Sequence, residues 1–177
     1  MRCTRSLLIV VPLTAAVLAG AAGAAPVETV PLSPASSKVH LRAYALGLVS
    51  LNGNFTRFDG TLRFDPADAA SCTAALTVDV ASLTMSNPTA RAEIIGPEFL
   101  DAARFPTLRF EGKCDTTGVD GMLMMHGVLR PVRLKMSWDR QDVTVVTSLR
   151  RADWGITAKP LLVGATVRIR VEATRPR

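Results

Sequence analysis

The chain has 177 residues, of which 48% are hydrophobic, 20% charged and 5% aromatic. This is enough apolar material for one domain with its own core. The formal net charge is +6, the basic residues are interspersed with acidic ones, and aromatic residues are few. The sequence therefore lacks the clustered basic face and the stacking residues typical of nucleic-acid binders, and we expect no nucleic-acid partner.

The first segment has the three-part layout of a secretory signal. Arg2 and Arg5 precede an apolar run at 7–19, and small residues follow it. We predict that residues 1–24 are a signal peptide, cleaved after Ala24 or at a neighbouring alanine, and that the mature protein is exported with a net charge of +4. The apolar run is shorter than the roughly 20 residues of a spanning helix, so we expect no stable membrane span after signal removal; an uncleaved anchor is the alternative.

The mature chain divides into a proline-containing extended lead-in, 25–36, and one domain, 37–174. Apolar and polar residues alternate through most of this domain, as in strands with one buried face. A helical stretch at 89–103, interrupted by Gly96 and Pro97, lies between the third and fourth strands and predicts two short helical pieces. The eight predicted strands are one beginning at Val39 and those at 55–64, 72–80, 107–114, 121–127, 131–138, 142–150 and 162–173.

These elements predict an all-β fold. Several short antiparallel strands must protect their edges, and closing the sheet into a barrel removes the edges. We therefore expect an eight-stranded antiparallel barrel with a short helical insertion. A barrel of this size is either filled by its own side chains or holds one slender ligand.

The predicted register of two strands places two cysteines opposite each other. An antiparallel pairing that sets Val78 beside Leu108 brings Cys72 opposite Cys114 on the same face. Because Cys3 leaves with the signal, these are the two cysteines of the mature chain. In an oxidising compartment such a pair predicts a disulfide, with two buried free thiols as the alternative.

The predicted inner face of the barrel combines small and mid-sized apolar residues. So many small residues favour a partly empty interior, although alternating small and large residues also let opposite walls interdigitate. We expect the pore to be lined by Leu41, Ala43, Ala45, Leu62, Phe64, Leu76, Val78, Leu108, Phe110, Leu134, Met136, Ala165 and Val167.

Residues suited to catalysis are scarce. The chain has two histidines and none of the common hydrolase, zinc, redox, phosphate-loop or dinucleotide motifs, so we predict no catalytic residues, no metal and no cofactor. His126 is expected at a barrel rim, either bonded to backbone or touching a polar ligand end. Trp154 is expected to close one end, as a structural plug or a gate. Arg151 and Asp153 are expected to form a weak surface pair. Asp101 is expected to be a structural anchor.

Five segments together resemble the YceI-like periplasmic proteins, also described as polyisoprenoid-binding, lipocalin-like barrels. Each segment is weak alone, but their order and spacing make the resemblance specific. They are Gly53-Asn54-Phe55 with Phe58-Asp59-Gly60-Thr61 and Phe64-Asp65-Pro66; Val78 to Leu83; Glu98-Phe99-Leu100-Asp101 with Phe105-Pro106-Thr107-Leu108-Arg109-Phe110; His126-Gly127-Val128 with Arg130-Pro131-Val132; and Arg151-Ala152-Asp153-Trp154-Gly155.

The resemblance implies a lipocalin-like barrel in the periplasm that binds, carries or stores a polyisoprenoid or quinone-like lipid, as a monomer or homodimer and without catalysis. The sequence departs from the family pattern at two places. Residues 90–93 stand where relatives often have Arg-Asp-x-His, and Ala45 stands where many have histidine. These departures place head-group recognition in question. The alternatives are a shape-driven isomerase or cyclase on an apolar substrate, and a ligand-free structural or stress-response interaction module.

Overall fold

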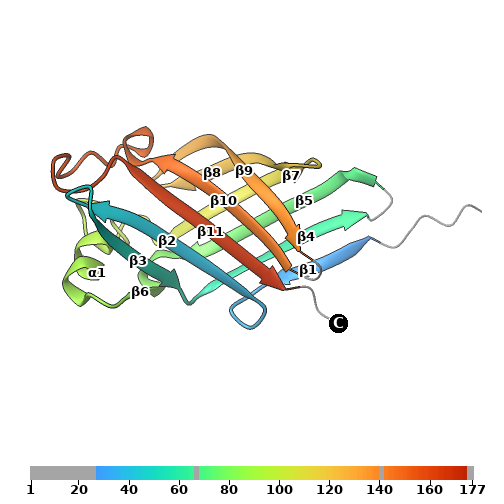
Figure 1. The fold of residues 1–177 in the computed structure, drawn as a ribbon, viewed down its shortest axis with the longest axis horizontal. Coiled ribbons are helices and arrows are strands. Elements are labelled where there is room, and N and C mark those ends of the chain that lie inside the picture. The colour runs from blue at the N-terminus through green and yellow to red at the C-terminus, as the bar shows by residue number, and fades with distance from the viewer. Residues whose placement is uncertain (1–26, 66–67, 140–141, 175–177) are drawn as a thin grey trace, which may run out of the picture.

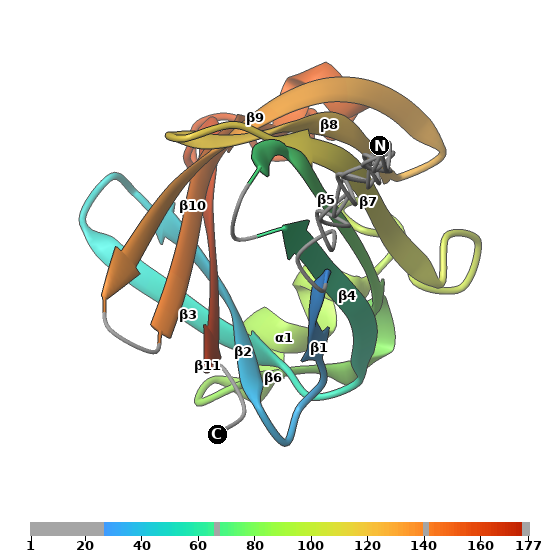
Figure 2. The same cartoon turned by 90° about the vertical axis from the view of Figure 1, so that its right-hand side faces the viewer.

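The computed structural model describes residues 27–65, 68–139 and 142–174, so the predicted signal peptide lies outside the described residues. Within these ranges one antiparallel sheet, in the order β1-β4-β5-β7-β8-β9-β10-β11-β2-β3-β6, curls around a central axis (Figure 1, Figure 2). The predicted all-β, lipocalin-like barrel is confirmed. The strands are β1 Glu28–Leu32, β2 Ser37–Ala45, β3 Val49–Phe55, β4 Phe58–Asp65, β5 Asp68–Asp79, β6 Leu83–Met85, β7 Thr107–Cys114, β8 Gly118–Met125, β9 Val128–Asp139, β10 Asp142–Arg150 and β11 Thr166–Thr174.

Period-two alternation explains the long strands. In β2, Val39, Leu41 and Ala43 are buried and the residues between them are half-buried or exposed. The predicted bounds of β7 and β10 are confirmed at both ends. Burial of one face per strand fixes which side of the sheet faces the barrel interior.

The described residues contain eleven strands where the sequence predicts eight. β1 lies in the predicted lead-in, pairs with β4 and forms one edge of the sheet, where the missing N–H of Pro31 is tolerated. β3 is mostly polar and exposed, so its alternation is weak. β6 has only three residues and forms the other edge. The prediction is wrong in number because these strands carry little apolar pattern.

Two chain connections run between the two edge regions of the curled sheet. β3 runs into β4 through Thr56 and Arg57, and β5 runs into β6 through the 3-10 turn η1 (Val80–Ser82). The Thr56 N–H donates to the Ser82 carbonyl at 3.3 Å, and the Asp79 N–H donates to the Arg57 carbonyl at 3.0 Å. The Ser82 hydroxyl donates to the Asp79 carbonyl at 2.7 Å. These bonds satisfy backbone groups that an open sheet edge would expose.

The helical insertion is one helix, α1 (Pro88–Ile95), rather than the two predicted pieces. The Asn87 side chain caps its start by accepting from the Ala90 N–H at 3.0 Å, and Pro88 occupies the first turn. The helix ends at Gly96, and Pro97 has no N–H to continue the helical hydrogen bonds beyond it. α1 lies at the same end of the barrel as the β2–β3 turn (Figure 1).

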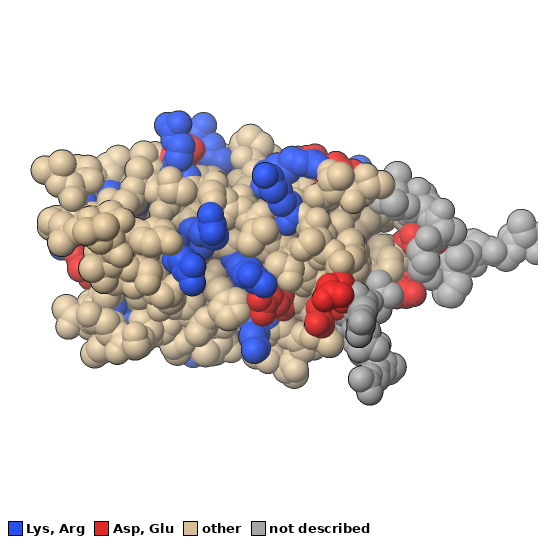
Figure 3. Space-filling model, viewed as in Figure 1, with Lys and Arg blue, Asp and Glu red and all other residues tan. Residues whose placement is uncertain are grey.

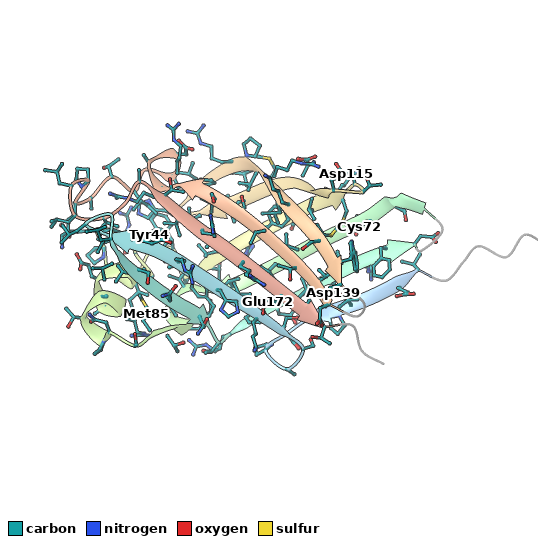
Figure 4. All side chains as sticks on the ribbon, in the orientation of Figure 1. Tyr44, Cys72, Met85, Asp115, Asp139 and Glu172 are labelled. Carbon is teal, nitrogen blue, oxygen red and sulfur yellow. A yellow bond between two sulfur atoms is a disulfide. The ribbon has the colours of Figure 1, made fainter. Side chains whose placement is uncertain are left out.

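The opposite end of the barrel is packed solid. Cys72 on β5 and Cys114 on β7 form a disulfide, with Cα atoms 4.9 Å apart, and the paired register of Val78 with Leu108 is as predicted. Figure 4 places Cys72 near the Asp115 turn and far from Tyr44. Both cysteines belong to a buried cluster that closes this end; its other members are Val30, Leu62, Phe64, Phe110, Val119 and Val143.

Candidate functional site: an apolar cavity inside the barrel

The barrel interior between its two ends is hollow. One cavity lies at the α1 end and a second adjoins it toward the disulfide end, and each leaves about 80 Å³ for the centre of a water-sized molecule. They share the walls formed by Leu108, Met125, Leu149 and Ile169. Both cavities are narrow, and the adjoining pair suits a long, thin ligand better than a compact one.

Inward residues of the middle strands are only partly buried, as expected for side chains that border an empty space. Leu76, Leu108 and Leu134 point inward on β5, β7 and β9, yet all three are half-buried rather than buried. In a filled barrel these positions would be fully enclosed. The same pattern on β11 involves Val167 and Ile169.

The structure distributes the thirteen predicted lining residues over three environments. Those that line the two cavities are Leu41, Ala43, Leu76, Val78, Leu108, Phe110, Leu134 and Val167. Leu62 and Phe64 lie in the packed cluster at the disulfide end, and Met136 packs against that cluster. Ala45 bridges to Val163, and Ala165 is exposed just before β11. The strand pattern identified faces correctly, but depth along the barrel axis depends on strand tilt and twist, which alternation does not encode.

Other wall residues were missed by the sequence reasoning. Met125, Leu149 and Ile169 line both cavities. The alternation pattern does mark Ile169 as inward-facing, because it stands between Arg168 and Arg170 in the cleanest predicted strand. Met125 follows Met122, Leu123 and Met124 in β8, where the alternation is blurred, so only its observed burial and place in the cavity wall assign it inward.

The predicted surface pair between Arg151 and Asp153 is wrong. Arg151, the first residue of the 3-10 turn η2 (Arg151–Trp154), is only 5% exposed and lines the cavity at the α1 end. Its side chain donates to the carbonyls of residues 156, 163 and 164. Asp153 instead lies 3.7 Å from Arg150, in an exposed contact worth little. Residues 151–154 form a 3-10 turn, in which residues two apart do not share a face.

Trp154 and His126 lie together outside the cavity wall. Trp154 is buried, and its indole N–H donates to the Leu123 carbonyl at 3.4 Å. His126 Nδ1 lies 3.1 Å from the Trp154 carbonyl, and the His126 ring packs on Phe105, with ring centroids 4.7 Å apart. The contact of His126 with a backbone carbonyl is the one its structural alternative expects, and Trp154 is held by a hydrogen bond to a backbone carbonyl.

Asp101, expected to be an anchor, is buried at the turn after α1, where its carbonyl accepts from the backbone N–H groups of Arg104 and Phe105. It adopts a left-handed backbone with φ of 45°. His40 is half-exposed and its Nδ1 lies 2.5 Å from Asn54 Oδ1 on the neighbouring strand. In the described ranges no cluster of three or more His, Cys, Asp or Glu side chains is arranged to hold a metal ion.

The opening of the α1-end cavity carries one acidic residue and an apolar rim. Glu93 on α1 pairs with Lys159, which also lies 3.3 Å from Glu98, and the two carboxylates raise the pKa of Lys159 above its usual value. Nearby loop tips present Leu48 and Leu161, which are 89% and 91% exposed. On the face shown in Figure 3 this end is largely uncharged, whereas basic side chains gather over the middle of the barrel.

A hollow antiparallel barrel with an apolar interior defines the class of ligand-binding, lipocalin-like barrels. A profile of the YceI-like domain matches residues 31–175, and the chain belongs to that family. The chain is 26% identical over 141 residues to a UPF0312 protein of Vibrio cholerae, covering 69% of this chain and 73% of that protein. It is 28% identical over 127 residues to a UPF0312 protein of Pseudomonas putida, covering 63% and 66%.

Solved structures show the same fold. BcnA of Burkholderia cenocepacia superposes with a TM-score of 0.70 at 24% identity, over 81% of this chain and 99% of BcnA. A polyisoprenoid binding domain from Saccharophagus degradans, implicated in plant cell wall breakdown, has a TM-score of 0.60 at 14% identity, over 84% and 98%. The YCEI protein of Campylobacter jejuni has a TM-score of 0.56 at 21% identity, over 71% and 85%.

Proposed function

We propose that this protein binds a long apolar lipid, of the polyisoprenoid or quinone-like class, inside its barrel and carries or stores it. The observation that carries the proposal is the pair of adjoining cavities lined almost wholly by apolar side chains. Burying a methylene group contributes about 0.8 kcal/mol, so a long chain gains affinity without precise polar contacts. The family and the likeness to a polyisoprenoid binding domain support the same ligand class.

The role we propose is binding rather than catalysis. His126, the residue most suited to proton transfer, is engaged with a backbone carbonyl and an aromatic ring instead of facing the cavities. Of the two charged residues lining the α1-end cavity, Glu93 is held by Lys159 and Arg151 by backbone carbonyls. A barrel packed by its own side chains, as a ligand-free module requires, is disfavoured by the two cavities.

We also propose that the protein works in the periplasm after export. The disulfide between Cys72 and Cys114 supports this, because such bonds persist in oxidising compartments. None of the helices in the described part of the chain has the length and apolar character that a bilayer crossing requires. Expression of the full chain in a Gram-negative bacterium, osmotic release and N-terminal sequencing test the export; retention of residues 1–24 on a cytoplasmic product contradicts it.

Identification of bound lipid tests the main proposal. The protein purified without detergent is extracted with organic solvent, and the extract is analysed by mass spectrometry; we expect a prenyl or quinone-like lipid in stoichiometric amount. Native mass spectrometry then compares Leu76→Asp, which charges the cavity wall, with Thr77→Asp on the exposed face of the same strand. The Leu76 variant should lose the lipid and the Thr77 variant should keep it, with both secreted. Equal retention in folded variants contradicts the proposal.

A further inference from the structure

The α1-end cavity contains a buried cation. Arg151 is 5% exposed and lines this cavity together with Phe99 and Val163. Its guanidinium is fixed by the backbone around it: Nε donates to the Gly164 carbonyl at 3.1 Å, Nη1 to the Ile156 carbonyl at 2.9 Å, and Nη2 to the Val163 carbonyl at 3.1 Å. The charge is therefore held rigidly at the cavity wall.

No carboxylate in the described part of the chain lies within ion-pair distance of Arg151. Asp153 pairs outward with Arg150, and Glu93, the acid lining the same cavity, is paired with Lys159. A guanidinium carries five N–H donors and the three carbonyls engage one at each nitrogen, so one N–H on Nη1 and one on Nη2 remain. A buried charge without a counter-ion is costly, and contact with the Phe99 ring at 5.8 Å offsets only part of that cost.

The charged residues that line the two cavities lie at one end. The adjoining cavity toward the disulfide end is lined by aliphatic and aromatic residues and by Thr147, whose hydroxyl already donates to the Arg133 carbonyl at 3.1 Å. Both charged lining residues, Arg151 and the Lys159-paired Glu93, thus stand at the α1 end, and Thr147 is the one polar residue among the described residues that line the far end. An amphiphile would place its polar head at the α1 end and its tail toward the disulfide.

We infer that Arg151 binds an anionic head group, a phosphate or carboxylate, of the lipid whose tail fills the barrel. Two oxygens of one phosphate or carboxylate can accept from one N–H on each terminal nitrogen of a guanidinium. The ligand then supplies the missing negative charge. This inference rests on the proposed lipid-binding function and adds the charge and orientation of the ligand.

Two probes with the same C20 chain test the inference: geranylgeranyl monophosphate and geranylgeraniol. Their Kd values are measured by calorimetry at one pH and ionic strength for delipidated wild type, Arg151→Met, Arg151→Lys and the exposed neighbour Arg150→Met. Wild type and the Arg150 variant should bind the phosphate about tenfold or more tightly than the alcohol. Arg151→Met should lose this preference while keeping affinity for the alcohol, and Arg151→Lys should keep part of it.

A second readout needs no variant. In wild-type protein with 15N-labelled arginine, the side-chain N–H resonance of Arg151 should shift on adding the phosphate probe and stay in place with the alcohol. Equal affinity of wild type for the two probes, or a preference that survives in folded Arg151→Met, overturns the inference but leaves the lipid-binding proposal standing. Failure of wild type to bind either probe defeats the lipid-binding proposal itself.

Discussion

Cys72 and Cys114 are bonded to each other across neighbouring strands at the closed end of the barrel, at a sequence separation of 42. The segment between them contains η1, β6, α1 and the turn that follows. The bond closes this segment into a loop and so restricts its conformations in the unfolded chain. Because a disulfide that closes a loop of this length lowers the entropy of the unfolded state, it stabilises the barrel by about 2–4 kcal/mol.

We therefore predict that Cys72→Ala combined with Cys114→Ala lowers the free energy of unfolding by about 2–4 kcal/mol. Thermal unfolding of wild type and variant, each with and without reductant, measures this. Reductant should lower the Tm of wild type toward that of the variant and leave the variant unchanged. An equal response of both proteins to reductant would contradict the role of the bond.

Gly112 and Gly121 face each other on β7 and β8, and the Phe110 ring lies over this pair. A Cβ on Gly121 would lie 2.3 Å from the Glu111 carbonyl oxygen and 2.5 Å from Phe110 Cζ. Gly121→Ala should therefore destabilise the protein by about 1–3 kcal/mol despite the usual gain from replacing glycine in a strand.

Chemical denaturation measures that loss, and Gly47→Asn is the matched control. Gly47 has φ of 70°, a region that asparagine tolerates, and a Cβ there meets nothing within 4 Å. The control should change stability by less than about 0.5 kcal/mol. A Gly121 variant as stable as wild type would show that Phe110 moves without cost.

Leu108 lies where the two cavities meet, and its neighbour Arg109 is exposed on the outside of the same strand. Leu108→Trp should fill the junction and weaken binding of a C20 prenyl probe by about tenfold or more, because each methylene excluded from the cavity forfeits about 0.8 kcal/mol. Arg109→Trp should bind as wild type does. Calorimetric titration of the delipidated proteins measures both, and equal affinities would place the ligand elsewhere.

Sequence patterns predicted the sheet and its faces because burial of one face imposes a two-residue period. They also predicted the disulfide, since the register that pairs Val78 with Leu108 leaves no other partner opposite Cys72. Depth along the barrel was not predictable: Leu62 and Leu76 share the inward-facing pattern, yet Leu62 packs in the closed end and Leu76 lines the cavity. That difference depends on how far each strand is staggered and tilted.

The burial of Arg151 also lay beyond the sequence. A neighbouring acid two residues away suggested a surface pair, because pairing is the ordinary way to satisfy an arginine. The carbonyls that engage Arg151 belong to residues 156, 163 and 164, and they converge only because the segment after η2 folds back toward β2, where Leu46 N–H donates to the Leu162 carbonyl at 2.8 Å. Irregular backbone of this kind has no periodic signature.

Asp115, in the β7–β8 turn, makes the free energy of unfolding depend on pH in the acidic range. Its carboxylate accepts from the Thr117 N–H at 2.7 Å and the Gly118 N–H at 2.9 Å, and pairs with Arg133 at 2.8 Å. These bonds, that from the Thr117 backbone first and that from Arg133 next, hold the pKa of Asp115 well below its ordinary value of 3.8. A lowered folded-state pKa contributes stability above 3.8 that is lost as the pH falls toward the folded-state value.

Asp115→Asn should therefore lower the Tm at pH 7, and the difference from wild type should narrow as the pH falls from about 4 toward 2. The amide keeps the size of the side chain but carries no charge for Arg133, so the comparison isolates ionisation. Because the carboxylate is exposed, salt should also reduce the difference at pH 7. Thermal melts of both proteins across this pH range measure the effect; a difference that is constant with pH would mean that the turn depends on the shape of the side chain and not on its charge.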